Sequence, residues 1–474
     1  MATRTGAVKQ PDDSESLRAI LAKANETKTG DELAGIAAES DKERIAAKRT
    51  LARTTLETLR ENPVISAEDD EVTRAIQEAV REPVYERIAE WTVADLREFL
   101  VDPANEDREI QAIRGGLTSE MIAAVTKLMS NLDLVLATAK MTVTARCNTT
   151  VGRTGTLSFR LQPNDPADNI ENILASTREG LSYGVGDAVI GINPVNDDVT
   201  STTRILEATH ELIEEWGVPT QNCCLAHVTT QMDAIREGAP ADLVFQSLAG
   251  TERGNEEFGV DIELLDEAHD LAKRRCVSTG PNVMYFETGQ GSELSGDAHH
   301  GVDQLTLEAR CYGLAARYDP FLVNTVVGFI GPEYLYDGKQ IIRAGLEDVF
   351  MGKLHGIPMG IDACYTNHSQ ADQNDIENLL VILAAAGANF FITVPMGDDV
   401  MLNYQSASYH DAAALWELFD LDPVSEFSAW LEEHGILCVP APITVARISS
   451  SGIAVSQPSI RSLRAAARAT PISP

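Results

Sequence analysis

The chain has 474 residues, 44% of them hydrophobic, which is enough for one large α/β barrel with flanking pieces or for two to three average domains. Its formal net charge of −34 argues against nucleic-acid binding, because that function needs an electropositive surface. Scattered cysteines without a CxxC motif argue against a disulfide framework and a structural zinc site, and the absence of a long apolar run or a signal-peptide h-region predicts a cytoplasmic protein.

The first third of the chain is predicted to be helical. Residues 1–15 are polar and are expected to form a flexible N-terminus, whereas residues 16–145 alternate amphipathic stretches with helix breakers and are expected to form a helical N-terminal domain. Thr118 is expected to cap one of these helices. The acidic run at 68–71 is interpreted as a solvated helix start, with a subunit contact as the alternative. Without a catalytic constellation, this region is expected to be architectural.

Short apolar strands alternate with helical stretches between residues 150 and 420. Eight such strands over about 250 residues are typical of a (β/α)8 TIM barrel. A doubly wound open sheet is the alternative, but no glycine-rich dinucleotide fingerprint follows the first strand. The predicted strands are 157–162, 188–192, 223–228, 242–247, 283–286, 322–329, 357–361 and 389–394.

Residues 421–474 form the remainder of the chain. They begin with a short amphipathic helix that contains Trp430 and end in a segment rich in Ser, Ala and Arg. We expect this C-terminal tail to be disordered, with docking through its local basic character as the alternative. The predicted fold class is therefore α/β, a TIM barrel with a helical N-terminal domain and a short helical C-terminal extension.

The stretch 282–295, NVMYFETGQGSELS, has the clearest chemical character. An apolar run fit for a buried parallel strand ends on Glu287, and a glycine-rich loop follows at 288–292. A carboxylate at the tip of a buried strand is costly unless it has a partner or a ligand. In an α/β barrel that tip is where catalytic groups lie, although satisfaction by neighbouring backbone N–H groups is the alternative for any single strand.

Polar side chains recur at the ends of the other predicted strands. Because the carboxyl ends of barrel strands meet at one mouth, these side chains are expected to lie around one pocket. The set suits a small ligand with a hydroxyl and an ammonium group, since carboxylates would hold the cation while Arg160 and Asn193 donate to an oxygen. The structural alternative is an internal salt bridge, such as one between Arg160 and Glu287. A salt bridge and a ligand-binding site can exist together. The strand-end residues are Arg160, Gln162, Asn193, His227, Gln246, Glu287, Phe329 and Asp362.

Two possible metal motifs are rejected, so no metal ligand is predicted. Residues 297–301, DAHHG, nearly match the cobalamin-ligating pattern D-x-H-x-x-G, but the glycine falls one place early and the segment lies in a loop. Asp362 and His368 with Asp372 and Asp375 outline a hard-metal site. Asp372 and Asp375, however, lie where a helix N-terminus favours acids, so capping explains them better.

Long strings of the sequence carry a family resemblance. They include LQPND (161–165), GVGDAVIGINPV (184–195), YFETGQGS (285–292), DPFLVNTVVGFIGPEYLY (319–336) and IIRAGLEDVFMGKLHGI (341–357). Together they resemble the large subunit of ethanolamine ammonia-lyase, over a region from about residue 21 to about residue 435. The first dozen residues and the tail are unlike that family.

The resemblance implies an adenosylcobalamin-dependent radical lyase that converts 2-aminoethanol to acetaldehyde and ammonia. It also implies a small-subunit partner that supplies much of the corrin-binding surface, within a large hetero-oligomer of paired subunits. Some relatives work in or beside a bacterial microcompartment, which is the alternative to the open cytoplasm. From the residues alone, a metal-dependent barrel aldolase or hydrolase and a non-catalytic scaffold subunit stay as alternatives, although buried charges in a barrel mouth speak against a scaffold.

The resemblance also implies roles for individual residues. Arg160 and Asn193 are expected to hold the substrate hydroxyl, and Gln162, Glu287 and Asp362 its ammonium group. Glu287 is expected to reach both ends of the substrate and to relay protons, so Arg160, Glu287 and Asp362 are the predicted catalytic residues. The positions that match cofactor-facing residues of the family are Pro194, Gln246, Ser295 and Met401.

Overall fold

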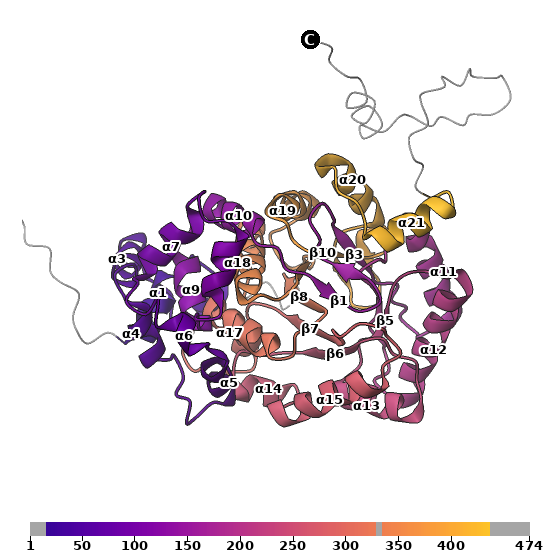
Figure 1. Cartoon of the computed structure of the whole chain (residues 1–474), viewed down its shortest axis with the longest axis horizontal. Coiled ribbons are helices and arrows are strands. Elements are labelled where there is room, and N and C mark those ends of the chain that lie inside the picture. Colours follow the sequence, from indigo (N-terminus) through magenta and orange to yellow (C-terminus); the bar gives the residue numbers. More distant parts are fainter. Residues whose placement is uncertain (1–15, 329–333, 437–474) are drawn as a thin grey trace, which may run out of the picture.

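An eight-stranded parallel sheet curls into a nearly closed barrel at the centre of the molecule (Figure 1). The structure is a computed structural model that describes residues 16–328 and 334–436. The hydrogen-bonded order is β5-β4-β3-β10-β9-β8-β7-β6. The strands are β3 (Ser158–Leu161), β4 (Val189–Ile192), β5 (Asn222–Cys224), β6 (Val244–Ser247), β7 (Met284–Thr288), β8 (Leu322–Val327), β9 (Met359–Ala363) and β10 (Phe390–Thr393).

The predicted (β/α)8 architecture is confirmed, and the largest departure from the predicted strand bounds is in β5. Strand β5 ends at Cys224, whereas the prediction extended it to residue 228. The backbone turns there because His227 is the N-cap of the next helix and its side chain accepts a hydrogen bond from Thr229 N. Capping therefore prevails over the apolar run in this segment.

Polar side chains close the seam between β5 and β6, the two ends of the hydrogen-bonded order, which lie next to each other. Asn222 Oδ1 accepts from Asp242 N at 3.0 Å, and Asp242 Oδ2 accepts from Asn222 N at 2.9 Å. Further along, the Gln231 side chain accepts from Phe245 N at 2.9 Å and donates to Phe245 O at 2.8 Å. These bonds satisfy backbone groups that a longer β5 would otherwise have paired.

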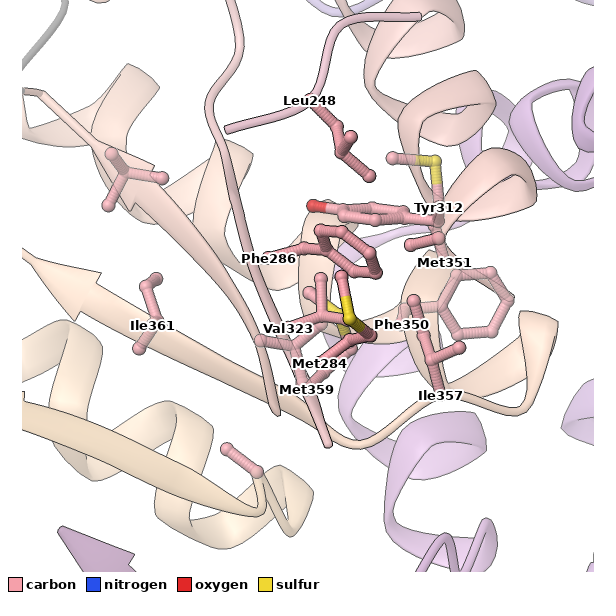
Figure 2. Close-up of a cluster of buried hydrophobic side chains, with 14 of the residues drawn as sticks. Leu248, Met284, Phe286, Tyr312, Val323, Phe350, Met351, Ile357, Met359 and Ile361 are labelled. Atoms are coloured by element: carbon pink, nitrogen blue, oxygen red, sulfur yellow. The ribbon is translucent and has the colours of Figure 1, made fainter. Parts of the chain in front are cut away.

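Helices cover the outer face of the barrel (Figure 1). Figure 2 shows Phe286 of β7 and Val323 of β8 in an apolar layer with Tyr312 and Phe350 from two covering helices. The helices are α11 (Ile170–Ser182), α12 (Val199–Trp216), α13 (Val228–Glu237), α14 (Glu252–Glu257), α15 (Ile262–Arg275), α16 (Ser292–Ser295), α17 (Gln304–Ala316), α18 (Gly338–His355), α19 (Gln373–Ala386), α20 (Tyr409–Phe419) and α21 (Ser425–Glu433). Helix α12 ends at Gly217, whose φ of +59° lies in the left-handed region that favours glycine.

The interior of the barrel near the amino ends of the strands is apolar. Buried residues of β4, β5, β6, β7, β8 and β10 form one cluster there, together with side chains of a short antiparallel hairpin made by β1 (Ala145–Arg146) and β2 (Thr150–Val151). This plug leaves the opposite end, the mouth at the carboxyl ends of the strands, as the place for polar side chains. The cluster includes Val189, Cys223, Phe245, Tyr285, Leu322 and Phe390.

The N-terminal region is helical as predicted and lies against α17 and α18 (Figure 1). Thr118 caps a helix through a hydrogen bond from Met121 N, as expected. The helices are α1 (Leu17–Ala24), α2 (Thr29–Leu33), α3 (Asp41–Leu51), α4 (Leu56–Glu61), α5 (Glu71–Ala79), α6 (Glu82–Tyr85), α7 (Val93–Val101), α8 (Asp107–Arg114), α9 (Ser119–Leu128) and α10 (Asn131–Lys140).

The acidic run at 68–71 starts a helix, but the prediction that it is solvated is wrong for Asp70. This residue is the N-cap of α5 and is 1% exposed. Its carboxylate accepts from Arg310 Nη2 of α17 at 2.7 Å, and Arg310 Nη1 binds Glu120 of α9 at 2.7 Å. Buried ion pairs thus join the N-terminal helices to the barrel helices, and the domain boundary near residue 145 stays a prediction.

Several predictions lie outside the described residues: the flexible N-terminus, most of the C-terminal tail, and Phe329 at the end of β8. The short helix predicted around Trp430 is present as α21. None of the described helices combines the length and apolar character needed to cross a membrane.

Candidate active site

Arg160 of β3 organises the mouth of the barrel. Its side chain has no exposed surface and enters the barrel beside Gly191, where a Cβ atom would lie only 2.7 Å from Arg160 Nε. Nη1 donates to Glu287 Oε1 at 2.5 Å and to Tyr285 OH at 2.6 Å. Nη2 donates to Asn193 Oδ1 at 2.8 Å. The Arg160–Glu287 salt bridge considered from the sequence is therefore present.

Glu287 is held through one of its two carboxylate oxygens. Its Oε1 accepts from Arg160 and from Tyr285 OH, the latter at 2.8 Å. No hydrogen bond from a described residue reaches Oε2, and the side chain is 15% exposed. Burial raises the pKa of the Tyr285 hydroxyl well above its usual value, so it acts as a neutral donor. The anchored carboxylate therefore keeps one oxygen for a ligand.

The electrostatic state of Arg160 follows from its neighbours. Burial by itself lowers the pKa of a guanidinium, but the oxygens of Tyr285, Glu287 and Tyr404 raise the Arg160 pKa above its usual value. Arg160 is thus a permanent cation, and its ring-face contact with Tyr285, 5.4 Å from guanidinium carbon to ring centroid, adds to its fixation.

A second group of side chains surrounds Asp362 at the end of β9. Asp362 Oδ2 accepts from Tyr404 OH at 2.6 Å, and Oδ1 accepts from the Ser406 hydroxyl. Tyr404 OH in turn accepts from Gln162 Nε2 at 2.9 Å, and the same amide nitrogen donates to Asp399 at 2.7 Å. Both amide protons of Gln162 are therefore engaged, which leaves its carbonyl oxygen as the group available to a cation.

Asp362 is 3% exposed, and this burial raises the pKa of its carboxyl to about 6 against the lowering effect of the Ser406 and Tyr404 hydrogen bonds. Glu287 raises this pKa as well, because two nearby carboxylates disfavour a second charge, whereas Arg160 lowers it. A cation placed between Glu287 and Asp362 would relieve that repulsion.

Asn193, just after β4, has a fixed orientation. Its Oδ1 accepts from Arg160, and its backbone N donates to Asn164 Oδ1 at 2.8 Å. Asn164 Nδ2 reaches Asp399 at 2.8 Å. With its carbonyl oxygen occupied, Asn193 presents its amide N–H groups as donors to a ligand oxygen.

The remaining strand-end residues have other roles. His227 caps α13, and its Nε2 lies 2.9 Å from Phe258 O. The expectation that His227 lies in the mouth is therefore wrong. Gln246 is 4% exposed, and its Oε1 accepts from Val228 N at 3.1 Å across the β5–β6 seam. Its position at the end of β6 nevertheless places it at the rim of the mouth.

Several residues of the site were missed from the sequence: Tyr285, Asn164, Asp399, Tyr404 and Ser406. Tyr285 carried a usable signal, because it precedes Glu287 by two positions in β7 and so lies on the same face of the strand. The others come from loops. Tyr404 lies on β12 (Tyr404–Gln405), which pairs with β11 (Asp398–Asp399) after a single 3-10 turn, η1 (Pro395–Gly397). Loop side chains of this kind have no periodic pattern that reveals their direction.

The comparisons with known proteins identify the family. A sequence model of the ethanolamine ammonia-lyase large subunit family (EutB) matches residues 13–443. The chain belongs to that family. It is 54% identical over 423 residues to the ethanolamine ammonia-lyase large subunits of Escherichia coli (strain K12) and Salmonella typhimurium (strain LT2), which covers 89% of this chain and 93% of each relative.

A solved structure gives only a distant similarity. The truncated 3-deoxy-D-arabino-heptulosonate 7-phosphate synthase from Thermotoga maritima is 14% identical, with a TM-score of 0.35, over 59% of this chain and 94% of that chain. A likeness at this level supports no argument about the function of this EutB family member.

The residues expected to face a cofactor all lie in or after strand ends, on the side of the mouth. Pro194 follows β4 and is half-buried, whereas Ser295 at the end of α16 is exposed. Met401 is half-buried, and its backbone N donates to Asp399 Oδ1 at 3.0 Å. The Asp399 carboxylate that orients Gln162 therefore also fixes the loop that carries Met401.

The alternative metal site is not assembled. Asp372 caps α19 in a capping box with Asp375, as the sequence predicted, and His368 is exposed. Within residues 16–328 and 334–436, no group of three or more His, Cys, Asp or Glu side chains is arranged to hold a metal ion. The Asp362 oxygens instead accept hydrogen bonds from hydroxyl groups.

Proposed function

We propose that this chain is the catalytic large subunit of an ethanolamine ammonia-lyase, which converts 2-aminoethanol to acetaldehyde and ammonia. Membership of the family supports the reaction class. The observation that supports the substrate most directly is the polarity of the mouth. It has a donor side at Asn193 beside Arg160 and an acceptor side at Glu287 and Asp362.

The ammonium group of the substrate is bound on the acceptor side. The Gln162 carbonyl oxygen, the Oε2 oxygen of Glu287 and the Asp362 carboxylate are acceptors for its three protons. A charge-assisted hydrogen bond in a site this buried is stronger than one in water, so a small cation can be held despite its few atoms. Binding of the cation also favours the ionised form of Asp362, whose pKa is raised to about 6 without a ligand.

The hydroxyl group is bound on the donor side. The Asn193 amide N–H groups are free to donate to the hydroxyl oxygen. Arg160 donates there by giving up its longest contact, Nη2 to Gly191 O at 3.4 Å, which is the weakest of its hydrogen bonds. Glu287 accepts the hydroxyl proton, so this residue contacts both ends of the substrate and can relay a proton between them.

We propose adenosylcobalamin as the cofactor, and the rim of the mouth fits a large organic group. Beside the polar floor, the loops after β4 and β10 expose apolar side chains: Val195 is 46%, Val400 66% and Met396 78% exposed. Exposed apolar side chains that border a polar pocket mark a binding surface. Pro194, Gln246, Ser295 and Met401 would hold the cofactor, which supplies the radical that abstracts and returns a substrate hydrogen atom.

The protein itself binds the substrate, keeps its two ends in place and excludes water from the floor of the barrel. We propose that a small subunit completes the site from the side of the mouth, within a hetero-oligomer of paired subunits, because the word "large" in the relatives' names implies a smaller companion. We also propose that the complex works in the cytoplasm, with a bacterial microcompartment as the alternative.

The decisive experiment is an anaerobic EPR measurement. The purified chain is mixed with its small subunit, adenosylcobalamin and 2-aminoethanol and is frozen during turnover. We expect an organic-radical signal that requires the substrate, together with release of acetaldehyde and ammonia. A silent spectrum from a folded complex with bound cofactor would contradict ethanolamine as the substrate. Loss of activity to a chelator and its recovery with a divalent ion would favour the metal-dependent alternative.

A further inference from the structure

Two buried carboxyl groups lie directly outside the strand pair that carries Glu287. Glu308 belongs to α17 and Asp348 to α18, and both are 0% exposed. Neither touches the proposed substrate pocket. Among the described residues, neither has a cation within salt-bridge distance, because the nearby cations bind other carboxylates: Arg310 binds Asp70 and Glu120, Lys127 binds Asp303, and Lys28 and Arg343 bind Glu347.

Both acids hold the strands through threonine hydroxyls. Thr288 follows Glu287 in β7 and pairs in register with Thr325 of β8. Because side chains alternate across a strand, these threonines point outward while Glu287 points into the barrel. The Thr288 hydroxyl donates to Glu308 Oε1, and the Thr325 hydroxyl donates to Asp348 Oδ2 at 2.8 Å.

Further donors complete the cluster. Tyr312 OH, which lies beside Phe286 in Figure 2, donates to Glu308 Oε1 at 2.7 Å. Gln290 Nε2, from the glycine-rich loop after β7, donates to Asp348 Oδ1 at 2.7 Å. The cluster therefore fixes Thr288, the last residue of β7, and Gln290 in the loop that follows, both directly after Glu287 in the chain.

The charge state of the pair follows from its surroundings. Burial raises the pKa of Glu308 well above its usual value, and the neighbouring Asp348 and Glu293 raise it further. Burial also raises the pKa of Asp348 to about 7, with Glu347 raising it and Lys28 lowering it. Two buried acids that repel each other cannot both ionise near neutral pH, so one proton stays on the pair.

A hydrogen-bond count agrees with a neutral Glu308. Its Oε1 accepts two hydroxyl bonds, whereas its buried Oε2 has no partner among the described residues. A buried anionic oxygen without a donor costs more than a buried neutral hydroxyl without an acceptor, because only the anion leaves a full charge unsolvated. The neutral acid is therefore the form that the site accommodates.

We propose that Glu308 and Asp348 together keep one proton, which is the shared proton of the pair without a direct hydrogen bond between them, and act as positioning residues for Glu287. They act through Thr288 and Thr325, which they hold from outside the barrel. Loss of the shared proton would place two repelling charges behind β7 and β8 and loosen the strand pair. The role assigned to Glu287 rests on the proposed function, whereas the shared proton does not.

The test uses Glu308→Gln in the full chain reconstituted with its small subunit and adenosylcobalamin. Glutamine keeps an acceptor for both hydroxyls and imitates the neutral acid, so we expect kcat and KM at pH 7 to stay within about twofold of wild type. Wild-type kcat should fall at alkaline pH as the pair loses its proton. The variant has no such proton to lose, so this decline should be absent from its kcat profile over the same pH range.

Thermal unfolding of the chain alone gives an independent readout. A carboxyl whose pKa is raised in the folded state stabilises the fold below its unfolded pKa and loses that contribution as pH rises through the folded pKa. The thermal stability of the wild-type chain should thus fall between pH 5 and pH 8 relative to that of Glu308→Gln. We expect the variant to match wild type at pH 5 and to have a Tm higher by roughly 2–4 °C at pH 8.

Matched variants separate positioning from mere packing. Thr288→Val removes the hydroxyl that transmits the contact and should lower kcat about tenfold. Thr177→Val removes a similarly buried hydroxyl, on α11, and should leave kcat unchanged. A Glu308→Gln variant that is less stable than wild type at both pH values, or fails to fold, would overturn the shared proton. Normal kcat in Thr288→Val would overturn the positioning role.

Failure of the proposed function would instead appear as an inactive wild-type enzyme. The unfolding experiment would still test the shared proton in that case, because it does not depend on activity.

Discussion

At the scale of single residues, the mouth depends on side chains that commit some of their hydrogen bonds to the protein and keep others for a ligand. Glu287 commits Oε1 to Arg160 and Tyr285, and Gln162 commits its amide nitrogen to Tyr404 and Asp399. The hydrogen bonds that each side chain makes to the protein fix its orientation. A rigid site recognises a ligand of few atoms in this way.

Glu287→Gln tests the two-ended role of this carboxylate. The amide keeps the shape of the side chain but removes its charge and its capacity to take a proton. We expect turnover to fall by about 10² or more. The chain should keep its wild-type circular dichroism spectrum, because the 15% exposed side chain is not part of the apolar core. Near-normal turnover would contradict the assignment of the site.

The pKa of Asp362 predicts an acid limb in the pH profile of kcat/KM. In the proposed site this carboxylate binds the substrate ammonium only when ionised, and its pKa in the free enzyme is raised to about 6. We therefore expect kcat/KM to decline as pH falls through about 6. Steady-state kinetics from pH 5 to pH 8 measure this, and Asp362→Asn should have a low, flat profile over the same range. An unchanged acid limb in Asp362→Asn would assign it to another group.

At the scale of elements, the alternation of side chains along β7 divides one strand between two tasks. Glu287 faces the proposed substrate pocket. Phe286 faces the covering helices in the apolar layer shown in Figure 2, and the Thr288 hydroxyl donates to Glu308 of α17. Helices α17 and α18 thus lie between the N-terminal helices and the strands of the site. Their buried polar side chains bind the N-terminal helices on one side and the strands of the site on the other.

The contact between α9 and α17 provides a stability prediction. Lys127 is 0% exposed and donates to Asp303 at 2.7 Å and to the Thr306 hydroxyl at 2.8 Å. Lys127→Ala leaves Asp303 buried without its cation, so we expect the free energy of unfolding to fall by about 3–5 kcal/mol. Lys23→Ala is the control, because its ion pair with Glu43 is about one-third exposed and should contribute about 0–1 kcal/mol. Chemical denaturation measures both, and equal losses would show that burial of the ion pair is irrelevant.

At the scale of the whole molecule, the plug of apolar side chains and the β1–β2 hairpin close one end of the barrel and leave the other for exchange with solvent and partners. The chain has a net charge of −34, and the floor of the site is acidic as well, because the carboxylates of Glu287, Asp362 and Asp399 surround the single guanidinium of Arg160. An acidic floor suits a small cation, so we expect large partners to bind at the rim, where apolar side chains are exposed.

Substitution of that rim should affect assembly and leave folding intact. Met396→Asp places a charge on a side chain that is 78% exposed beside the mouth, so we expect weaker binding of the cofactor and the small subunit, by about tenfold or more, with an unchanged Tm. Leu33→Asp on α2, at a side chain that is 69% exposed, is the matched control and should bind normally. Titration followed by cofactor absorbance and analytical ultracentrifugation measures both effects. Equal affinity in the two variants would remove the rim from the binding surface.

The sequence by itself determined the eight strands and the main polar residues of the mouth, because both depend on local pattern. Buried parallel strands must be short apolar runs, and a charge at the end of such a run is conspicuous. Arg160, Glu287 and Asp362 were found in this way. His227 was misplaced by the same rule, since its local role as a helix cap competes with the strand pattern.

Only the tertiary structure decided which polar groups meet and which carry charge. Tyr404 and Ser406 reach Asp362 from a hairpin loop about forty residues later, and Asp70 is buried by Arg310 from a different helix. Whether an acid is ionised depends on its burial and on its neighbours' charges, which are properties of the folded arrangement. The proton proposed for Glu308 and Asp348 therefore has no signature in the sequence, because it depends on two neighbouring helices burying both carboxyl groups against the same pair of strands.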